Sequence, residues 1–373
     1  MRISLVEVYQ VDLPVKGGLY RLSGGREYRS FDATLVRLVA EEGLDGWGET
    51  TPFGGTYIAA HGAGVRAALT VLGPAVLGLD PRLTDRIGDA MDAVLDGHLS
   101  AKAAIDIACW DLFGKSVGMA VCDLLGGRIP GRVPVISSIG SDTPEAMRAS
   151  VARHRASGFR GHSIKIGAAE TDGGPSLDAE RLEACLADRQ PGEWFLADAN
   201  GGMTPEQVLR FLALLPSGLD FVLEAPCATW RETLSLRARC SVPILVDELL
   251  QSEGDLAQVI AADAADGVGL KITKQGGLTR TRRMRDTSAA AGLVMSIQDT
   301  TGSDLCFAAI LHVAQSTPRR HLRCALDPRE TTDRLVGNLH APIREGGAEA
   351  PDLPGLGIEI DRARLGPPVA SYG

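Results

Sequence analysis

The first part of the chain alternates apolar and polar residues and then changes to a helical spacing. Residues 2–12 carry apolar side chains at alternating positions, which is typical of a half-buried strand. Residues 34–40 and 47–50 form two further strand-like runs, with the turn sequence Gly43-Leu44-Asp45-Gly46 between them. From about residue 61 to 118 the apolar spacing is helical, most clearly over residues 101–114. These patterns predict strands followed by helices.

From about residue 133 short apolar runs recur, each followed by a helix-like segment. Runs of valine, isoleucine and leucine without alternation fit strands that are buried on both faces. Their repetition predicts parallel strands with crossover helices, and eight units in about 200 residues predict an α/β fold with a closed (β/α)₈ barrel. An open doubly wound sheet is the alternative, because the eighth run is weak. The eight runs span residues 133–137, 162–166, 194–198, 221–224, 243–247, 267–271, 293–297 and 321–324.

We therefore divide the chain into three parts. Residues 1–127 form an N-terminal α+β domain, residues 128–327 form the barrel, and residues 328–373 form a Gly- and Pro-rich segment that packs back on the first domain. The glycine-rich stretch of residues 17–25 is predicted to be a flexible loop, which in an enzyme could serve as a lid.

Composition and charge exclude several classes of protein. The 373 residues carry a formal charge of −9, which argues against nucleic-acid binding. The basic cluster Arg280, Arg282, Arg283 and Arg285 is interpreted as the solvated face of a helix. No apolar stretch reaches about 18 residues, so no membrane contact is expected. Seven scattered cysteines without a Cys-x-x-Cys pair indicate small buried residues in a reducing compartment, so we expect a soluble cytoplasmic protein.

Charged residues stand at the ends of five of the predicted barrel strands. Lys165, Asp198, Glu224, Asp247 and Lys271 are separated by about one strand–helix unit each. The C-terminal ends of parallel barrel strands surround a single opening, which is where barrel enzymes keep their active sites. The sequence therefore predicts that these five residues converge on one cleft.

Three carboxylates crowded together repel one another unless a cation neutralises them. Oxygen ligands favour a hard ion such as Mg²⁺, and the seven histidines show no paired spacing that would favour zinc. Lys165 and Lys271 belong to strands two and six of eight, so they are expected to face each other across the cleft. A nearby metal and a second cation should lower the pKa of such a lysine and make it a base. Mg²⁺ would stabilise the enediolate formed when an α-proton leaves a carboxylate substrate.

Several segments together resemble the enolase superfamily, in the branch of mandelate racemase and muconate-lactonising enzymes, over essentially the whole chain. The segments are Gly46-Trp47-Gly48-Glu49, residues 103–112, Leu124-Leu125-Gly126-Gly127, Asp198-Ala199-Asn200, Glu224-Ala225-Pro226, Asp247-Glu248 and residues 271–277. The resemblance implies a capping domain on a barrel and one Mg²⁺ per site held by Asp198, Glu224 and Asp247. It further implies that Lys165 and Lys271 are catalytic and that Asn200 and Glu248 orient the metal ligands.

One departure concerns the first base, which in the family usually lies in a Lys-x-Lys pair. Here the segment is Ser163-Ile164-Lys165, so a neighbouring cation is missing. Residues 52–57, 297–304 and 354–358 resemble members that act on proline derivatives, namely hydroxyproline-betaine epimerases and cis-3-hydroxy-L-proline dehydratases. The resemblance implies substrate contacts from Tyr20, Tyr57, Ser163, Asp299, Thr300 and Thr301.

The expected activity is abstraction of the α-proton of a small, proline-like carboxylate, followed by loss of water from cis-3-hydroxy-L-proline. Racemisation or epimerisation of an amino acid or proline betaine is the alternative, because a base on each face serves both outcomes. A non-catalytic barrel that binds an acid through its metal is a remote alternative, since a binder needs no lysine pair. A homo-oligomer is expected.

Overall fold

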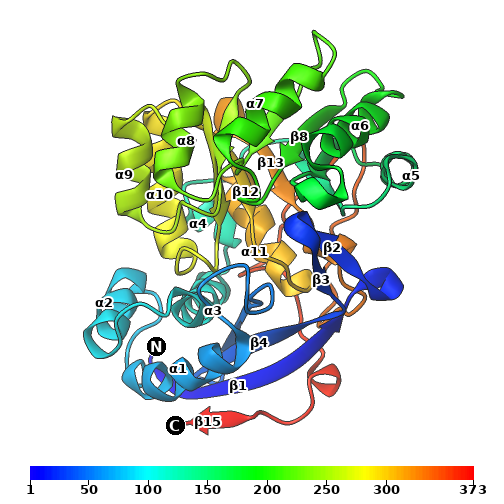
Figure 1. Cartoon of the computed structure of the whole chain (residues 1–373). Coiled ribbons are helices and arrows are strands. Elements are labelled where there is room, and N and C mark those ends of the chain that lie inside the picture. The colour runs from blue at the N-terminus through cyan, green and yellow to red at the C-terminus, as the bar shows by residue number, and fades with distance from the viewer.

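A four-stranded antiparallel sheet forms the base of the N-terminal domain (Figure 1). The computed structural model describes all residues from Met1 to Gly373. The sheet has the order β15-β1-β4-β5, with β1 Ile3–Pro14, β4 Ser30–Ala40, β5 Asp45–Thr50 and β15 Ala370–Tyr372. Strand β15 pairs with β1, so the last residues of the chain return to the first domain as the sequence predicted.

Four helices cover this sheet and connect it to the barrel. They are α1 Gly62–Ala75, α2 Thr84–Val94, α3 Leu99–Val117 and the short α4 Val121–Leu124. Helix α3 is buried on almost every side, because the capping sheet and the barrel both pack on it. A Cβ at Gly48 would lie 2.1 Å from the carbonyl oxygen of Ala104, so only glycine permits β5 to lie this close to α3.

The glycine-rich stretch, predicted as a flexible loop, contains one strand of a short hairpin and its turn; the lid role stays a prediction. Strands β2 Tyr20–Leu22 and β3 Arg26–Tyr28 pair across a 3-10 turn, Ser23–Gly25, and a second 3-10 turn, Lys16–Gly18, precedes them. Gly24 and Gly25 adopt φ angles of 70° and 72°, which side chains with a Cβ rarely adopt. The hairpin reaches from the capping sheet toward the barrel (Figure 1).

Eight parallel strands close into a barrel, so the barrel prediction is confirmed and the open-sheet alternative is wrong. Strands β13 and β6 pair with each other and complete the ring through Ala325 opposite Val135. The eighth run, which was the weakest in the sequence, forms a regular strand. The barrel strands are β6 Val133–Ile139, β7 Gly161–Lys165, β8 Trp194–Asp198, β9 Val222–Glu224, β10 Ile244–Val246, β11 Gly267–Lys271, β12 Val294–Gln298 and β13 Leu322–Leu326.

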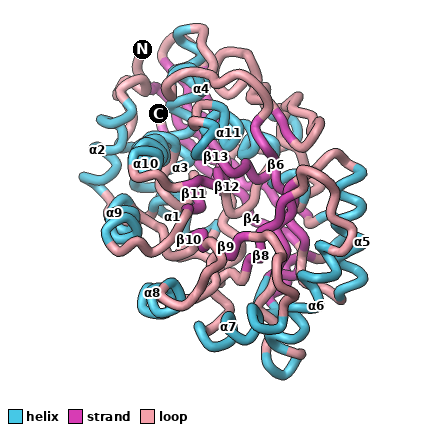
Figure 2. Tube along the Cα trace, turned by 90° about the horizontal axis from the view of Figure 1, so that it is seen from above, coloured by secondary structure: helices cyan, strands magenta, loops and turns pink.

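Helices surround the strands on the outside of the barrel (Figure 2). They are α5 Pro144–Ala156, α6 Gly174–Leu186, α7 Pro205–Leu214, α8 Trp230–Arg237, α9 Glu253–Ala261, α10 Leu278–Ala290 and α11 Asp304–Gln315. Capping boxes begin α7, α8 and α9, where the side chains of Thr204, Thr229 and Ser252 accept backbone hydrogen bonds. A short strand, β14 Gly347–Ala348, pairs antiparallel with β6.

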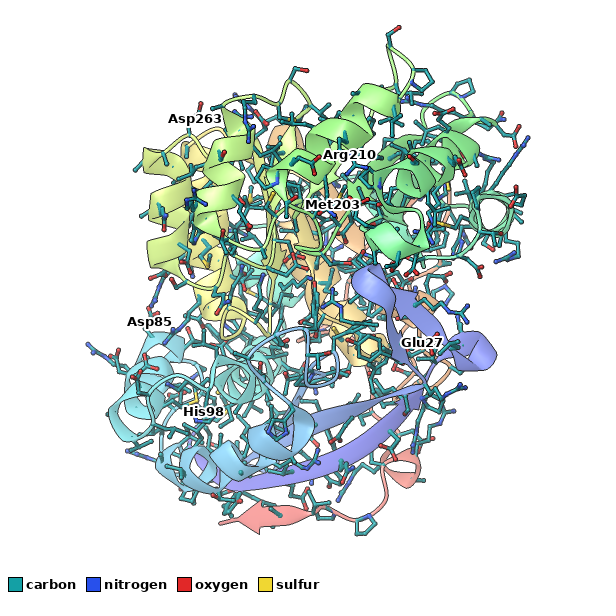
Figure 3. The ribbon with its side chains drawn as sticks, viewed as in Figure 1. Glu27, Asp85, His98, Met203, Arg210 and Asp263 are labelled. Carbon is teal, nitrogen blue, oxygen red and sulfur yellow. The ribbon has the colours of Figure 1, made fainter.

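The arginine cluster on α10 belongs to the domain junction, and the prediction of a solvated face was wrong for part of it. Arg285 is only 4% exposed and donates to the Leu125 carbonyl and the Ser316 hydroxyl. Arg283 pairs with Asp85 of α2, which is labelled in Figure 3. Sequence periodicity could not reveal this, because the packing of the capping domain on α10 decides which arginines lose contact with water.

All seven cysteines are free, and all but the partly buried Cys240 are buried. This confirms their interpretation as small interior side chains. None of the helices combines the length and the apolar character that crossing a membrane requires.

Candidate active site

The C-terminal ends of the barrel strands bring the five predicted charged residues to one rim. Lys165, Asp198, Glu224 and Lys271 are the last residues of β7, β8, β9 and β11, and Asp247 directly follows β10. The strand register places Asp198 beside both Lys165 and Glu224. Strands β7 and β11 are four positions apart in the eight-stranded ring, so the two lysines approach from opposite sides.

A small cavity of about 50 Å³ lies at this rim. The capping domain contributes Tyr20, Leu22, Phe53 and Tyr57, and the strand ends and following loops of the barrel contribute the other walls. Every residue predicted for the site lines this cavity except Asp247 and Glu248, which contact the lining residues Lys271 and Asn200, respectively. Figure 3 shows the side chains at this junction, with Glu27 marking the hairpin and Met203 the loop after β8.

Each lysine of the predicted pair is buried against a carboxylate. Lys165 forms an ion pair with Asp198, and Lys271 Nζ lies 2.5 Å from Asp247 Oδ2. Burial acts to lower the pKa of both lysines, but the facing carboxylates outweigh it and raise both above the ordinary lysine value. The lowered lysine pKa expected from the sequence concerns a lysine beside a bound metal ion, and it stays a prediction.

A third buried lysine, Lys274, completes the surroundings of Asp247. Its Nζ donates to the carboxylate of Asp247 at 2.8 Å and to the backbone carbonyl of the same residue at 2.7 Å. Burial acts to raise the pKa of Asp247, but Lys271 and Lys274 outweigh it and hold this pKa below its usual range. Asp247 is thus a permanent anion held by two cations.

Glu224 is the carboxylate without a cationic partner. Its hydrogen bond comes from the side-chain amide of Gln298, at 2.8 Å. Burial and the neighbouring charges of Asp198 and Asp247 raise the pKa of Glu224 to about 8. Glu224 is thus held near two other acids with no cation of its own, and a divalent cation bound between the three acids would favour its charged form.

The donor set fits Mg²⁺ in kind, because all three acidic side chains supply oxygen and they stand on adjacent strands. As the side chains stand, no three His, Cys, Asp or Glu residues gather tightly enough to hold a metal ion. Instead, the ammonium group of Lys165 binds a carboxylate oxygen of Asp198, and that of Lys271 binds a carboxylate oxygen of Asp247. The assignment of these carboxylates as metal ligands stays a prediction, supported by donor chemistry and strand placement.

Asn200 connects the first and third acidic segments. Its Nδ2 donates to Asp198 Oδ2 and to Glu248 Oε1, both at 3.0 Å, and its backbone N–H donates to Asp198 Oδ1 at 2.9 Å. Asn200 adopts a φ of 46°, a left-handed conformation that asparagine tolerates better than most residues. These contacts are those expected of a residue that orients Asp198.

Tyr57 covers Lys271 from the capping domain. Its hydroxyl hydrogen-bonds Lys271 Nζ and lies 3.4 Å from Asp247 Oδ2, and the lysine nitrogen is 4.5 Å from the centre of the ring. Tyr20 lies across the cavity, where its hydroxyl is 2.6 Å from Ser138 Oγ. Both tyrosines therefore join the capping domain to the barrel at the cavity that the predicted catalytic lysines line.

Ser163 and Asp299 present polar groups to the cavity from opposite parts of the barrel. Ser163 Oγ is buried and has no hydrogen-bond partner within the protein. Asp299 is 2% exposed and accepts hydrogen bonds from Thr273 and from the backbone of Thr300. Burial raises the pKa of Asp299 to about 6, although these hydrogen bonds act in the opposite direction.

Thr300 and Thr301 line the cavity but use their hydroxyl groups on the protein. Thr300 Oγ1 donates to the Thr51 carbonyl at 2.5 Å, and Thr301 Oγ1 lies 3.3 Å from Thr331 Oγ1. Their hydroxyls therefore hold the loop after β12 against the capping domain and the C-terminal segment.

Three residues of the site were not predicted from the sequence, namely Lys274, Gln298 and Asp327. Gln298 ends β12 at the same rim, so the rule that selected charged strand ends could have found it had uncharged polar residues been included. Lys274 lies three residues after Lys271 within a segment already recognised. Asp327 lines the cavity but pairs with Arg329 at 2.8 Å, a contact with no signal in the sequence.

Two family models match the chain. Residues 28–126 match the mandelate racemase / muconate lactonizing enzyme N-terminal domain, and residues 146–364 match the enolase C-terminal domain-like family. The chain is 39% identical over the full length of both chains to the cis-3-hydroxy-L-proline dehydratase of Roseibium aggregatum. It is 27% identical to the N-succinyl-L-Arg/Lys racemase of Bacillus cereus, over 98% of this chain and 97% of that one.

A crystal structure from Roseovarius nubinhibens, described as of the mandelate racemase/muconate lactonizing type and complexed with magnesium, superposes on the whole chain. The two chains are 62% identical, each is fully covered, and the TM-score is 0.98. Curated relatives include a dehydratase, a racemase and chloromuconate cycloisomerases, all of them enzymes. The chain therefore belongs to the enolase superfamily, as an enzyme with the mandelate racemase/muconate lactonizing type of capping domain and barrel.

Proposed function

We propose that the protein is a Mg²⁺-dependent dehydratase of cis-3-hydroxy-L-proline or a closely related proline derivative. The observation that carries this proposal is the pair of buried lysines, Lys165 and Lys271, which line one small cavity from opposite strands. Three carboxylates stand at the same rim between them. Two amines on opposite sides of a substrate can remove a proton from one face and deliver a proton to the other.

Asp198, Glu224 and Asp247 would hold the metal. Bound there, Mg²⁺ supplies stabilisation of the negative charge that develops on the substrate carboxylate when the α-proton leaves. For Lys165 and Lys271 to contact the substrate, each must exchange its present carboxylate partner for it. Lys274 is held by Asp247 in addition, since its nitrogen bonds both the carboxylate and the backbone carbonyl of that residue.

The lysine pair suits loss of water from cis-3-hydroxy-L-proline. In this compound the hydroxyl group lies on the carboxylate side of the ring and the α-proton lies on the other side. One neutral lysine accepts the α-proton, and the other, protonated, donates a proton to the leaving hydroxyl as the Cβ–O bond breaks. The products are water and an enamine, which tautomerises to a ring imine.

Asp299 supports a substrate that carries an ammonium group. Its carboxylate is buried, lines the cavity and accepts hydrogen bonds from neutral donors. It forms no ion pair with a lysine or arginine of the protein. A buried carboxylate of this kind is stabilised by a cationic ligand. Ser163, with its unpartnered hydroxyl, offers a further polar contact to a substrate held between Lys165 and Asp299.

The similarity to the Roseibium aggregatum dehydratase over full length supports this substrate class. Racemisation or epimerisation is the second candidate, because the same first step leads to it if the proton returns to the α-carbon from the opposite face. The racemase relative from Bacillus cereus and a hydrophobic dipeptide epimerase of Enterococcus faecalis favour that candidate.

The test is NMR in deuterated solvent with Mg²⁺ and a panel of proline derivatives that includes cis-3-hydroxy-L-proline and a proline betaine. A ring imine is expected with the hydroxyproline. Lys165→Ala and Lys271→Ala should each abolish turnover, whereas Lys16→Ala, at an exposed lysine away from the cavity, should retain it. Formation of the α-epimer with deuterium at the α-carbon, and no ring imine, would instead identify an epimerase. No exchange with any compound would refute both candidates for this panel.

A further inference from the structure

The turn of the β2–β3 hairpin inserts a polar side chain into the barrel rim. Ser23 is 1% exposed and follows the buried, cavity-lining Leu22, whereas the next two residues of the turn, Gly24 and Gly25, are exposed to solvent. The hairpin itself belongs to the capping domain, whereas both acceptors of the Ser23 hydroxyl belong to the end of β8 and the loop that follows it. A buried serine at the tip of an otherwise exposed turn indicates that the tip is docked through this hydroxyl.

The Ser23 hydroxyl reaches the first acidic segment directly. Its Oγ lies 3.1 Å from the backbone carbonyl of Asp198 and 3.0 Å from the side-chain oxygen of Asn200, so its single proton is shared between two acceptors. Arg26 supports the same contact by donating to the Ser23 carbonyl at 3.1 Å. The hairpin therefore contacts both the backbone of Asp198 and the residue that orients its carboxylate.

Ser23 and the two acids act together on the orientation of the Asn200 amide. A carboxamide has one end that accepts hydrogen bonds and one that donates them. With Oδ1 toward the Ser23 hydroxyl, Nδ2 points to Asp198 Oδ2 and Glu248 Oε1. With the amide reversed, the oxygen would face two carboxylates and be repelled. Ser23 thus favours the one orientation in which Asn200 donates to both acids.

We propose that Ser23 is a positioning residue that couples docking of the β2–β3 hairpin to Mg²⁺ binding, by holding Asn200 and through it the carboxylate of Asp198. The inference rests on the proposed metal site. Coupling between two binding events is reciprocal, so bound Mg²⁺ must stabilise the docked hairpin as much as the docked hairpin strengthens Mg²⁺ binding.

The hairpin offers a matched comparison for this inference. Tyr20 docks the same hairpin by a hydroxyl contact to Ser138 of β6, which touches none of the three acids. Tyr20→Phe and Ser23→Ala each remove one hydroxyl from the docked hairpin. Only Ser23→Ala removes a contact that leads to Asp198.

The experiment measures Mg²⁺ binding by titration calorimetry, and hydrogen–deuterium exchange over residues 20–28 with and without Mg²⁺, in the full-length wild type and both variants. Loss of one hydrogen bond that orients a ligand predicts that Mg²⁺ binds Ser23→Ala about fivefold to tenfold more weakly. Tyr20→Phe should bind Mg²⁺ within about twofold of wild type on the same reasoning. Mg²⁺ should slow exchange of the hairpin in wild type and in Tyr20→Phe, and clearly less in Ser23→Ala.

The coupling would be overturned if Ser23→Ala matched wild type in both Mg²⁺ affinity and hairpin protection. In that case, Mg²⁺ binding by wild type would still leave the proposed function intact. Equal weakening in both variants would also overturn it, since docking in general would then matter and the Asn200 contact would not. A wild type that binds no Mg²⁺ would refute the proposed metal site and, with it, this inference.

Discussion

His312 makes the stability of this protein sensitive to acid. The side chain lies on α11, is fully buried, and accepts a hydrogen bond at Nδ1 from the backbone N–H of Cys122, at 3.1 Å. The neutral ring fits this environment, because a proton on Nδ1 would face the Cys122 N–H. Burial lowers the pKa of His312 to about 4, with a smaller opposing contribution from the Leu356 backbone and a smaller lowering one from Arg128.

The sign and size of the effect follow from the two pKa values. In the unfolded chain the pKa of His312 is near its usual 6.5, so below that pH the unfolded state binds a proton that the folded state does not. The contribution is fully present above pH 6.5 and is lost as the pH falls toward 4. A difference of about 2.5 pKa units corresponds to about 3 kcal/mol of unfolding free energy lost between pH 7.5 and pH 4.

The assay is urea denaturation at a series of pH values for wild type and His312→Asn. Asparagine places an oxygen acceptor near the position of Nδ1 and does not titrate, so it keeps the bond from Cys122 and removes the proton uptake. His162 is also buried with a pKa lowered to about 4, and therefore contributes in the same direction in both proteins. Only the difference between the two curves reports His312.

We expect the difference in unfolding free energy between wild type and His312→Asn to change by about 3 kcal/mol between pH 7.5 and pH 4. The variant becomes more stable relative to wild type as the pH falls. A part of the difference that does not depend on pH is expected as well, since the smaller side chain leaves a cavity at every pH. Parallel curves across the whole range would refute the reasoning that His312 remains neutral because it is buried.

Three further predictions concern packing and charge. Gly48→Ala places a Cβ 2.1 Å from the Ala104 carbonyl oxygen and should lower the unfolding free energy by about 1–3 kcal/mol in chemical denaturation, and a neutral effect would contradict the close approach of β5 to α3. Lys274→Met removes a buried cation from Asp247 and should destabilise the protein by about 2–4 kcal/mol, which thermal and urea unfolding would both detect. Arg283→Ala should cost less than about 1 kcal/mol, because its ion pair is half exposed, and a larger loss that persists in high salt would contradict this.

The sequence by itself determined the barrel and the rim residues of its candidate site. A run of apolar residues without alternation is a local property of each strand. A charged residue at the end of such a run stays at the end of the strand, whatever surrounds it. Once the strands are parallel, their C-terminal ends must share one rim, which is why Lys165 and Lys271 could be placed across from each other before any coordinates were known. The family resemblance then named the class of chemistry.

Tertiary structure alone decided which groups contact one another at that rim. The contact of Ser23 with Asn200 joins residues 177 positions apart, and that of Tyr57 with Lys271 joins residues 214 apart. Neither has a signal in local periodicity, because both depend on how the capping domain packs on the barrel. The same packing buries Arg285, which a helical charge pattern assigned to the surface.

The lysine pKa values illustrate the same division between sequence and structure. Residue types and spacing indicated that acids and amines would meet, but not which acid each amine would contact. Direct pairing with Asp198 and Asp247 raises the pKa of Lys165 and Lys271, and this pairing has no signal in the sequence, because electrostatic interactions depend steeply on distance and burial. Periodicity along a chain is a short-range property that can be read from sequence, whereas charge pairing depends on distances that exist only after the domains have packed.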